Sequence, residues 1–199
     1  TSLSIGMTFE RGILNQTLQL VYGSIQAAID GSADGNTIEV CDGTYSGNIT
    51  VNKNISLVSK NGAAATILDG DDSGSHLGTI TLTSGRYGVV IGQTDKGFTI
   101  KGIDGPPGLE KASVYLQGTQ QNITVEGNIL EARGDAALMG EYNAVNNNIT
   151  INNNQITGQT FDGTEPATGD QFTVPNVARQ AVVFGGGPNT TNTGNFIFT

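Results

Sequence analysis

A short motif of apolar, polar and apolar residues recurs along this chain, and its spacing restricts the fold more than any other feature. The copies begin at Ile55, Ile80, Phe98, Ile123, Ile149, Phe172 and Phe196. Neighbouring copies are 23 to 26 residues apart, except that Phe98 follows Ile80 after only 18 residues. The middle residue is Ser or Thr in every copy but the last, which reads Phe196-Ile197-Phe198. We therefore treat the chain as a series of stacked units.

The alternation within each copy is typical of a β-strand with one buried face, because successive side chains of a strand point to opposite sides. One such strand cannot bury its apolar face alone. A unit of about 25 residues has room for three short strands and their turns. Parallel units stacked ~4.8 Å apart bury a continuous apolar column. The sequence predicts an all-β fold, a single-stranded right-handed parallel β-helix of about seven coils.

The composition agrees with short strands and tight turns, since the 199 residues include 29 Gly, no Trp and only 14% charged residues. The net charge of -9 excludes nucleic acid as a partner, because no basic stripe can replace the counterions of a phosphate backbone. No apolar run is long enough to cross a bilayer, so we expect no membrane insertion. The single cysteine, Cys41, cannot form an internal disulfide, so stability must come from the stacked core.

The asparagine-rich stretches near residues 146–148 and 152–154 fall between the predicted strands. Asparagine tolerates the left-handed backbone conformation that tight turns require. Stacked asparagine side chains can also hydrogen-bond from one coil to the next. We expect these asparagines to have a structural role.

A short amphipathic helix is predicted near the N-terminal end. Ser24 is a suitable N-cap, and Ile25, Ala28 and Ile29 have the spacing of one helix face. We divide the chain into residues 1–21, whose role the sequence leaves unknown, a capping helix at 22–31, and a β-helix at 32–199. The last copy of the motif opens a new coil, so we expect the β-helix to continue beyond the C-terminus or to be covered there by self-association or a further domain.

The residues around this helix carry a family resemblance. The matching segments are Tyr22-Gly23-Ser24-Ile25-Gln26-Ala27-Ala28-Ile29-Asp30, Gly35-Asn36-Thr37-Ile38-Glu39-Val40, Asp42-Gly43-Thr44-Tyr45, Ile49-Thr50-Val51, Ile55-Ser56-Leu57-Val58 and Thr66-Ile67-Leu68-Asp69-Gly70. They resemble the first coils of the pectin-lyase-like right-handed β-helix superfamily. That superfamily includes polysaccharide lyases, pectin methylesterases, C5-epimerases, periplasmic accessory proteins and bacterial surface proteins. The resemblance implies the fold and matches no specific enzyme family.

Two enzyme patterns of this superfamily are incomplete in the sequence. Arg179 and Gln180 resemble the oxyanion-hole region of pectin methylesterases, but Asn195 stands where the resemblance requires a nucleophilic Asp. An esterase mechanism therefore lacks its nucleophile. The only histidine, His76, has no second acidic cluster of the kind that polygalacturonase-like hydrolysis needs.

Two sets of residues remain as candidates for chemistry. Lys101 and Glu126 are expected in the same outward register one coil apart, and Glu131, Arg133 and Asp135 in the turn region that follows. Of these residues, Lys101, Glu126, Arg133 and Asp135 are candidate catalytic groups. The densest acidic spot contains Asp69, Asp71 and Asp72, whose oxygens are suitable ligands for Ca²⁺. No other cofactor is indicated.

The sequence favours a secreted or cell-surface module, with the periplasm as an alternative location, that binds carbohydrate or another surface without chemistry of its own. The alternative is a polysaccharide lyase or C5-epimerase that acts on acidic polysaccharide, with a site on loops 104–112 and 158–171. A Lys or Arg beside two carboxylates from adjacent coils would favour the enzyme, whereas a flat face of Asn, Thr and Tyr would favour binding.

Overall fold

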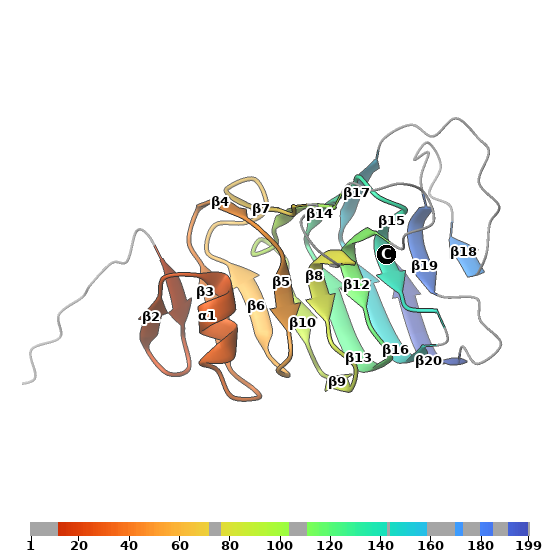
Figure 1. Cartoon of the computed structure of the whole chain (residues 1–199), viewed down its shortest axis with the longest axis horizontal. Coiled ribbons are helices and arrows are strands. Elements are labelled where there is room, and N and C mark those ends of the chain that lie inside the picture. Colours follow the sequence, from red (N-terminus) through yellow and green to blue (C-terminus); the bar gives the residue numbers. More distant parts are fainter. Residues whose placement is uncertain are drawn as a thin grey trace, which may run out of the picture.

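The structure is a computed structural model, and it describes residues 12–71, 77–103, 111–142 and 144–158 together with three later strands. The fold is all-β and consists of three sheets of mainly parallel strands with one short helix (Figure 1). No helix among the described residues is long and apolar enough to cross a membrane.

The three sheets are named here A, B and C. Sheet A contains β1 (Ile13–Asn15), β2 (Leu20–Tyr22), β3 (Thr37–Val40), β6 (Ser56–Ser59), β9 (Arg86–Tyr87), β10 (Val90–Ile91), β13 (Thr119–Glu126), β16 (Val145–Asn152) and β20 (Thr191–Phe198). Sheet B contains β4 (Gly43–Ser46), β7 (Thr66–Asp69), β11 (Thr99–Lys101), β14 (Ile129–Ala132) and β17 (Gln155–Gly158). Sheet C contains β5 (Ile49–Val51), β8 (Gly78–Leu82), β12 (Ala112–Leu116), β15 (Ala136–Gly140), β18 (Asp170–Phe172) and β19 (Gln180–Phe184).

The chain visits sheets A, B and C in turn and then returns to sheet A, so each circuit forms one three-sided coil. Strands of successive coils pair in parallel, as β13 pairs with β16 and β14 pairs with β17. The described strands form five complete coils, and β20 begins a sixth. The result is an all-β parallel solenoid, as the sequence predicted.

The prediction of about seven coils is wrong, because the coils do not have a uniform length of about 25 residues. One row of paired residues in sheet A contains Ile38, Leu57, Ile91, Val125, Ile151 and Phe198. The steps in this row run from 19 residues (57 − 38) to 47 residues (198 − 151). Several predicted repeats belong to different sides of the solenoid: Ile80 lies in sheet C and Phe98 immediately precedes β11 of sheet B.

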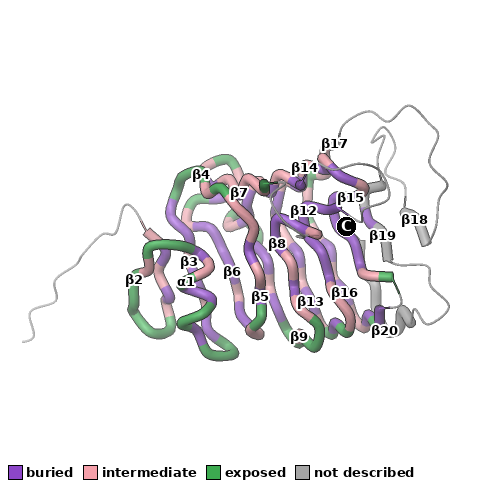
Figure 2. The backbone as a smooth tube through the Cα atoms, in the orientation of Figure 1, coloured by how far each residue is buried: buried purple, intermediate pink, exposed green. Residues whose placement is uncertain are grey.

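The apolar core runs along the inside of the solenoid as a continuous column (Figure 2). Ile123, Val125 and Ile149 are fully buried, and Ile151 is 4% exposed, which confirms that these side chains point inward. Ile123 pairs with Ile149 and Val125 with Ile151, so the register predicted for this part of the sequence is confirmed.

Asparagines join successive coils at two places, as expected. Asn122 and Asn148 both have positive φ (54° each), and the Nδ2 of Asn148 donates to Oδ1 of Asn122 at 2.9 Å. In the turn between sheets A and B, the Nδ2 of buried Asn128 donates to Oδ1 of Asn154 at 3.1 Å and to the carbonyl of Ile91 at 2.9 Å. Asn128 thus satisfies a backbone carbonyl at the turn. Asn122 and Asn148 instead lie within β13 and β16, so the prediction that the stretch 146–148 falls between strands is wrong.

The N-terminal end is covered by a hairpin and a helix. Strands β1 and β2 form an antiparallel hairpin that joins β3, so part of the segment 1–21 extends sheet A. Helix α1 (Ile25–Asp30) begins where the sequence predicted a helix, and Oγ of Ser24 accepts a hydrogen bond from the backbone N–H of Ala27 at 3.1 Å. Ile25, Ala28 and Ile29 are buried and belong to the core.

The C-terminal part departs from the predicted repeat. Phe172 ends β18, which pairs antiparallel with β19 of sheet C and therefore does not continue the column of sheet A. Strand β20 instead pairs directly with β16. Thr173 and Val174 lie outside the described residues.

Candidate functional site

The outer face of sheet B carries a row of charged side chains. Asp69 of coil 2, Lys101 of coil 3 and Glu131 of coil 4 are Cα partners in the parallel register. The residue before each of them points into the solenoid, since Leu68, Ile100 and Leu130 are fully buried. Because side chains alternate along a strand, the three charged groups point outward. Ser46 of coil 1 and Thr157 of coil 5 extend the row at its two ends.

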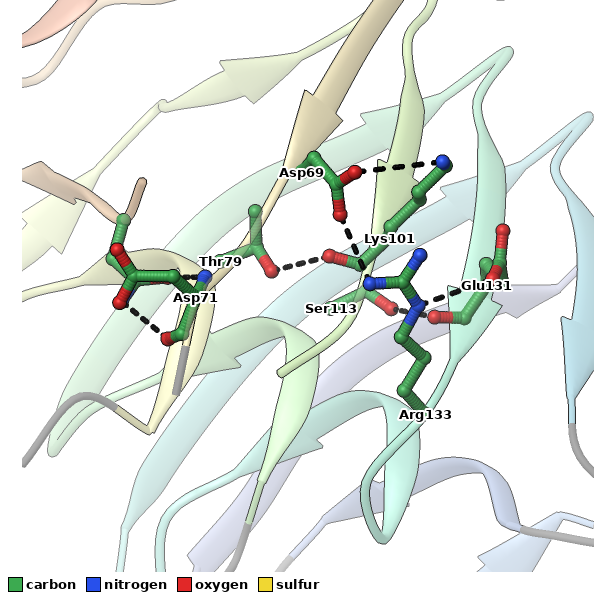
Figure 3. A network of polar contacts seen from close by, with 8 residues as sticks. Asp69, Asp71, Thr79, Lys101, Ser113, Glu131 and Arg133 are labelled. Carbon is green, nitrogen blue, oxygen red and sulfur yellow. Dashed lines mark hydrogen bonds and ion pairs between the residues drawn. The ribbon is translucent and has the colours of Figure 1, made fainter. Parts of the chain in front are cut away.

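Ion pairs connect these groups with Arg133, which follows β14 (Figure 3). The Nη1 of Arg133 lies 2.9 Å from Oδ1 of Asp69, and its Nε lies 3.2 Å from Oε1 of Glu131. The Nζ of Lys101 lies 3.5 Å from Oδ2 of Asp69. Asp69, Lys101, Glu131 and Arg133 are called the charged row below.

The charged row is partly exposed and electrically balanced. The side chains of Lys101 and Arg133 are each 27% exposed, that of Asp69 is 30% exposed and that of Glu131 is 38% exposed. Two carboxylates face two cations, so the row has no net charge. Each group can therefore contact a ligand while its neighbours hold it in position.

Electrostatics keep Arg133 protonated. Burial lowers the pKa of its guanidinium, but the hydrogen bond to Glu131 and the charges of Asp69 and Glu131 outweigh that effect, so the pKa is raised above its ordinary value. The guanidinium is thus a fixed cation with a planar set of donors.

Hydrogen bonds from sheet C support the backbone beneath the charged row. Oγ1 of Thr79 donates to the carbonyl of Lys101 at 2.6 Å, and Oγ of Ser113 donates to the carbonyl of Glu131 at 2.8 Å. The backbone is closely packed beside them, because a Cβ at Gly102 would lie 3.0 Å from both the carbonyl oxygen of Glu131 and Oγ of Ser113. The strands that present the charges are therefore held firmly.

The outer face of sheet C offers a different surface. Tyr115 is the Cα partner of Thr81 and Met139 in neighbouring strands. Although its side chain lies on the outer face of the sheet, it is fully buried. A second apolar cluster covers this face and consists of Ala112, Tyr115, Ala136 and Met139, with Leu77 packed against it. This cluster has no charged member, so the face does not compete with sheet B as a charged site.

Two of the four predicted catalytic residues, Lys101 and Arg133, belong to the charged row. The prediction that Glu126 shares a register with Lys101 is wrong, because Glu126 lies in sheet A, where it pairs with Asn152 and accepts a hydrogen bond from Oγ1 of Thr94 at 2.7 Å. Asp135 lies two residues beyond Arg133, and its backbone N–H donates to the carbonyl of Lys111 at 2.7 Å.

The three residues predicted to bind Ca²⁺ are placed differently from one another. Asp69 contacts two cations, which disfavours a divalent cation at the same carboxylate. The backbone of Asp71 exchanges hydrogen bonds with the side chain of Asn48. Asp72 lies outside the described residues, as do His76 and most of the two loops predicted for an enzyme site. Among the residues that the structure describes, no group of three or more acidic, His or Cys side chains could hold a metal ion.

The sequence analysis placed Glu131 in a turn region and did not identify it as a partner of Lys101, whereas it lies in β14. The two residues are 30 positions apart, and Asp69 is 32 positions before Lys101, whereas the apparent repeat suggested about 25. The signal that could have found the row is an apolar residue followed by a charged one at the end of each strand: Leu68-Asp69, Ile100-Lys101 and Leu130-Glu131.

No protein-family model matches the chain, and no curated protein matches it by sequence. Solved structures do resemble it. One is a protein classed as a glycosyl hydrolase from Parabacteroides merdae, with 14% identity, a TM-score of 0.42, and coverage of 86% of this chain and 88% of that chain. Another is a pectin methylesterase in complex with a hexasaccharide, with 12% identity, a TM-score of 0.43, and coverage of 90% of this chain and 64% of that chain. Similarity at this level carries no argument about function, which must come from the site itself.

Proposed function

We propose that this chain is an extracellular or cell-surface β-helix module that binds an uncharged, hydroxyl-rich glycan along the outer face of sheet B, without chemistry of its own. The observation that supports this proposal most is the charged row, in which carboxylates and cations alternate on one continuous sheet face.

The chemistry of the row suits sugar hydroxyls. A carboxylate accepts hydrogen bonds from hydroxyl groups, while ammonium and guanidinium groups donate to hydroxyl oxygens. Parallel strands place Asp69, Lys101 and Glu131 at steps of ~4.8 Å, so acceptors and donors alternate along the row. Ser46 and Thr157 add hydroxyl groups at both ends. An extended chain of sugars fits such a row better than a compact ligand.

The charge balance favours a neutral glycan. The charged row has no net charge, and the whole protein carries -9. A polyanionic ligand would therefore meet repulsion from the protein without a local excess of cations to offset it. This is the reason for preferring an uncharged polysaccharide to a uronate polymer.

We also infer that the coils wind right-handed, as in the pectin-lyase-like superfamily that the first coils resemble. Parallel strands of one sheet are joined by right-handed connections in nearly all known cases. A regular right-handed solenoid gives sheet B the long, even surface that a polysaccharide chain requires.

A lyase or C5-epimerase remains the second candidate, because Lys101 and Arg133 lie beside two carboxylates from different coils. Both reactions need a base that removes a proton from the sugar ring. Arg133 has a raised pKa and is not a ready base, and the Nζ of Lys101 is engaged by Oδ2 of Asp69 at 3.5 Å. This arrangement meets the criterion given above for an enzyme, and our preference for binding rests on the ion pairs that already engage both cations.

A glycan array with uncharged and uronate-containing glycans tests the proposal, followed by calorimetric titration of Lys101→Met and Glu131→Gln. We expect binding to uncharged glycans and a loss of about tenfold or more in affinity for either variant. Lys96→Met is the matched control, since it removes a comparable ion pair between Nζ of Lys96 and Oε2 of Glu39 (3.0 Å) away from sheet B. Equal affinity of all three variants and the wild type would overturn the proposal.

A further inference from the structure

A second outward row lies at the corner where the chain passes from sheet C to sheet A. Tyr87 of β9 is the Cα partner of Gln121 in β13, and Gln121 is the partner of Asn147 in β16. The alternate positions point inward, because Gln120 and Asn146 are fully buried. Tyr87, Gln121 and Asn147 therefore point outward from successive strands, and we name them the tyrosine strip.

Aromatic surface is concentrated at this corner. Tyr87 is 56% exposed, and Tyr142, in the turn between β15 and β16, is 50% exposed. Among the residues whose burial the structure describes, these are the exposed aromatic side chains; Tyr115 and Phe98 are fully buried. Gln121 is exposed on β13 as the Cα partner of Tyr87, so the strip combines an aromatic ring with amide groups.

The backbone that carries Tyr87 is held in place from both sides. The N–H of Tyr87 donates to Oδ1 of Asn54 at 2.9 Å, and the Nδ2 of Asn54 donates to Oδ2 of Asp34 at 2.8 Å. The N–H of Gly88, which has a φ of 69°, donates to the carbonyl of Gln121 at 3.0 Å. The backbone at Tyr87 is thus held in place, which lowers the entropy cost of ordering this segment when a ligand binds.

We propose that the tyrosine strip is a second glycan-binding site of this protein. A tyrosine ring offers a flat apolar surface to the C–H face of a sugar, and amides of Gln121 and Asn147 both donate to and accept from hydroxyl groups. The strip contains no ionised group, so its ligand is an uncharged glycan. This inference rests on the proposed function for the class of ligand, but it concerns different residues.

The two sites lie on different sides of the solenoid. In a three-sided coil the corner between sheets C and A is opposite sheet B, and in Figure 1 strand β9 lies at the lower edge while β7 and β14 lie at the upper edge. The charged row and the tyrosine strip therefore bind separate segments of glycan. Because they share no contacts, losses from the two sites should be independent.

Affinity electrophoresis in native gels that contain a neutral polysaccharide, such as β-glucan, galactomannan or xyloglucan, tests the inference. We expect Tyr87→Ala to lower the apparent affinity by about tenfold, because it removes the stacking surface. Tyr87→Phe keeps the ring and should retain most of the retardation. Leu20→Ala is the control for loss of exposed apolar surface, since Leu20 is 51% exposed in β2 at the N-terminal end. Thermal melting of each variant checks that it is folded.

The outcomes separate the two proposals. Loss of retardation in Tyr87→Ala, with Leu20→Ala unchanged, supports the tyrosine strip, whether or not Lys101→Met is affected. Unchanged retardation of Tyr87→Ala while Lys101→Met loses it would overturn the tyrosine strip and leave the proposed function standing. Absence of retardation of the wild type in all of these gels would contradict both.

Discussion

Arg133 and Asp69 are 64 residues apart in the sequence, yet Nη1 of Arg133 lies 2.9 Å from Oδ1 of Asp69. The guanidinium reaches from coil 4 to a carboxylate of coil 2 and also contacts Glu131 of its own coil. One side chain thereby fixes the spacing of two carboxylates on the outer face of sheet B. This geometry depends on a planar group with several donors.

Arg133→Lys is expected to weaken glycan binding by about tenfold, because an ammonium group cannot hold Asp69 and Glu131 in the same planar arrangement. Stability should change by less than about 1 kcal/mol, since the ion pairs are partly exposed. Calorimetric titration measures the first effect and urea unfolding the second. A large loss of stability with unchanged binding would mean that the pair is structural.

Ile149→Ala should destabilise the protein by about 2–5 kcal/mol. Ile149 is fully buried and pairs with Ile123 in the continuous core, so its truncation leaves a cavity between coils. Equilibrium unfolding in urea measures the difference in the free energy of unfolding. Thr150→Ala changes the neighbouring half-buried side chain and serves as the control, with an expected change below about 1 kcal/mol.

Asn128→Leu should destabilise by about 3 kcal/mol or more, although leucine is apolar and similar in volume. The amide of Asn128 accepts from the N–H of Phe98 at 2.9 Å and donates to the carbonyl of Ile91 at 2.9 Å. Both backbone groups lose a partner in the variant, and unpaired buried groups are costly. Hydrogen exchange should show faster exchange of the Phe98 amide, and unchanged exchange there would refute this role.

Tyr45 gives the protein a pH dependence in the alkaline range. Burial raises the pKa of the Tyr45 phenol, with a smaller effect from nearby Cys41 and Asp42, and its hydroxyl donates to the carbonyl of Cys41 at 2.9 Å. The pKa of Tyr45 in the folded state lies above the unfolded-state value of ~10. The contribution of its neutral phenol to the free energy of unfolding is therefore fully present below pH ~10, and it is lost as the pH rises through the folded-state pKa. Thermal melting between neutral and alkaline pH should show this decline, and Tyr45→Phe should have a shallower one. An identical decline in Tyr45→Phe would assign the effect to other groups.

The sequence alone predicted the parallel solenoid, the helix after Ser24 and the inward positions of Ile123 and Ile149, because these depend on local alternation and capping. It did not predict the coil boundaries. All three sides of the solenoid use the same apolar, polar, apolar alternation, so strands of different sheets, such as the one that contains Ile80 and the one that follows Phe98, resembled successive repeats.

The error in the coil length also led to a wrong partner for Lys101 in the predicted site. Lys101 and Arg133 were identified, but a uniform coil length placed Glu126 beside Lys101, whereas the true partners are Asp69 and Glu131. Turns of unequal length shift the register from coil to coil, and their lengths depend on tertiary packing. Periodicity therefore predicts which residues point outward better than it predicts which outward residues meet.

The most direct test of the central claim is an NMR titration of the labelled protein with an uncharged glycan selected on the array. We predict shifts of the backbone amides of Asp69, Lys101 and Glu131 and of the Nε–H of Arg133, with the glycan's own signals unchanged after prolonged incubation. A chemical change in the glycan, or shifts confined to residues outside the charged row, would contradict the account.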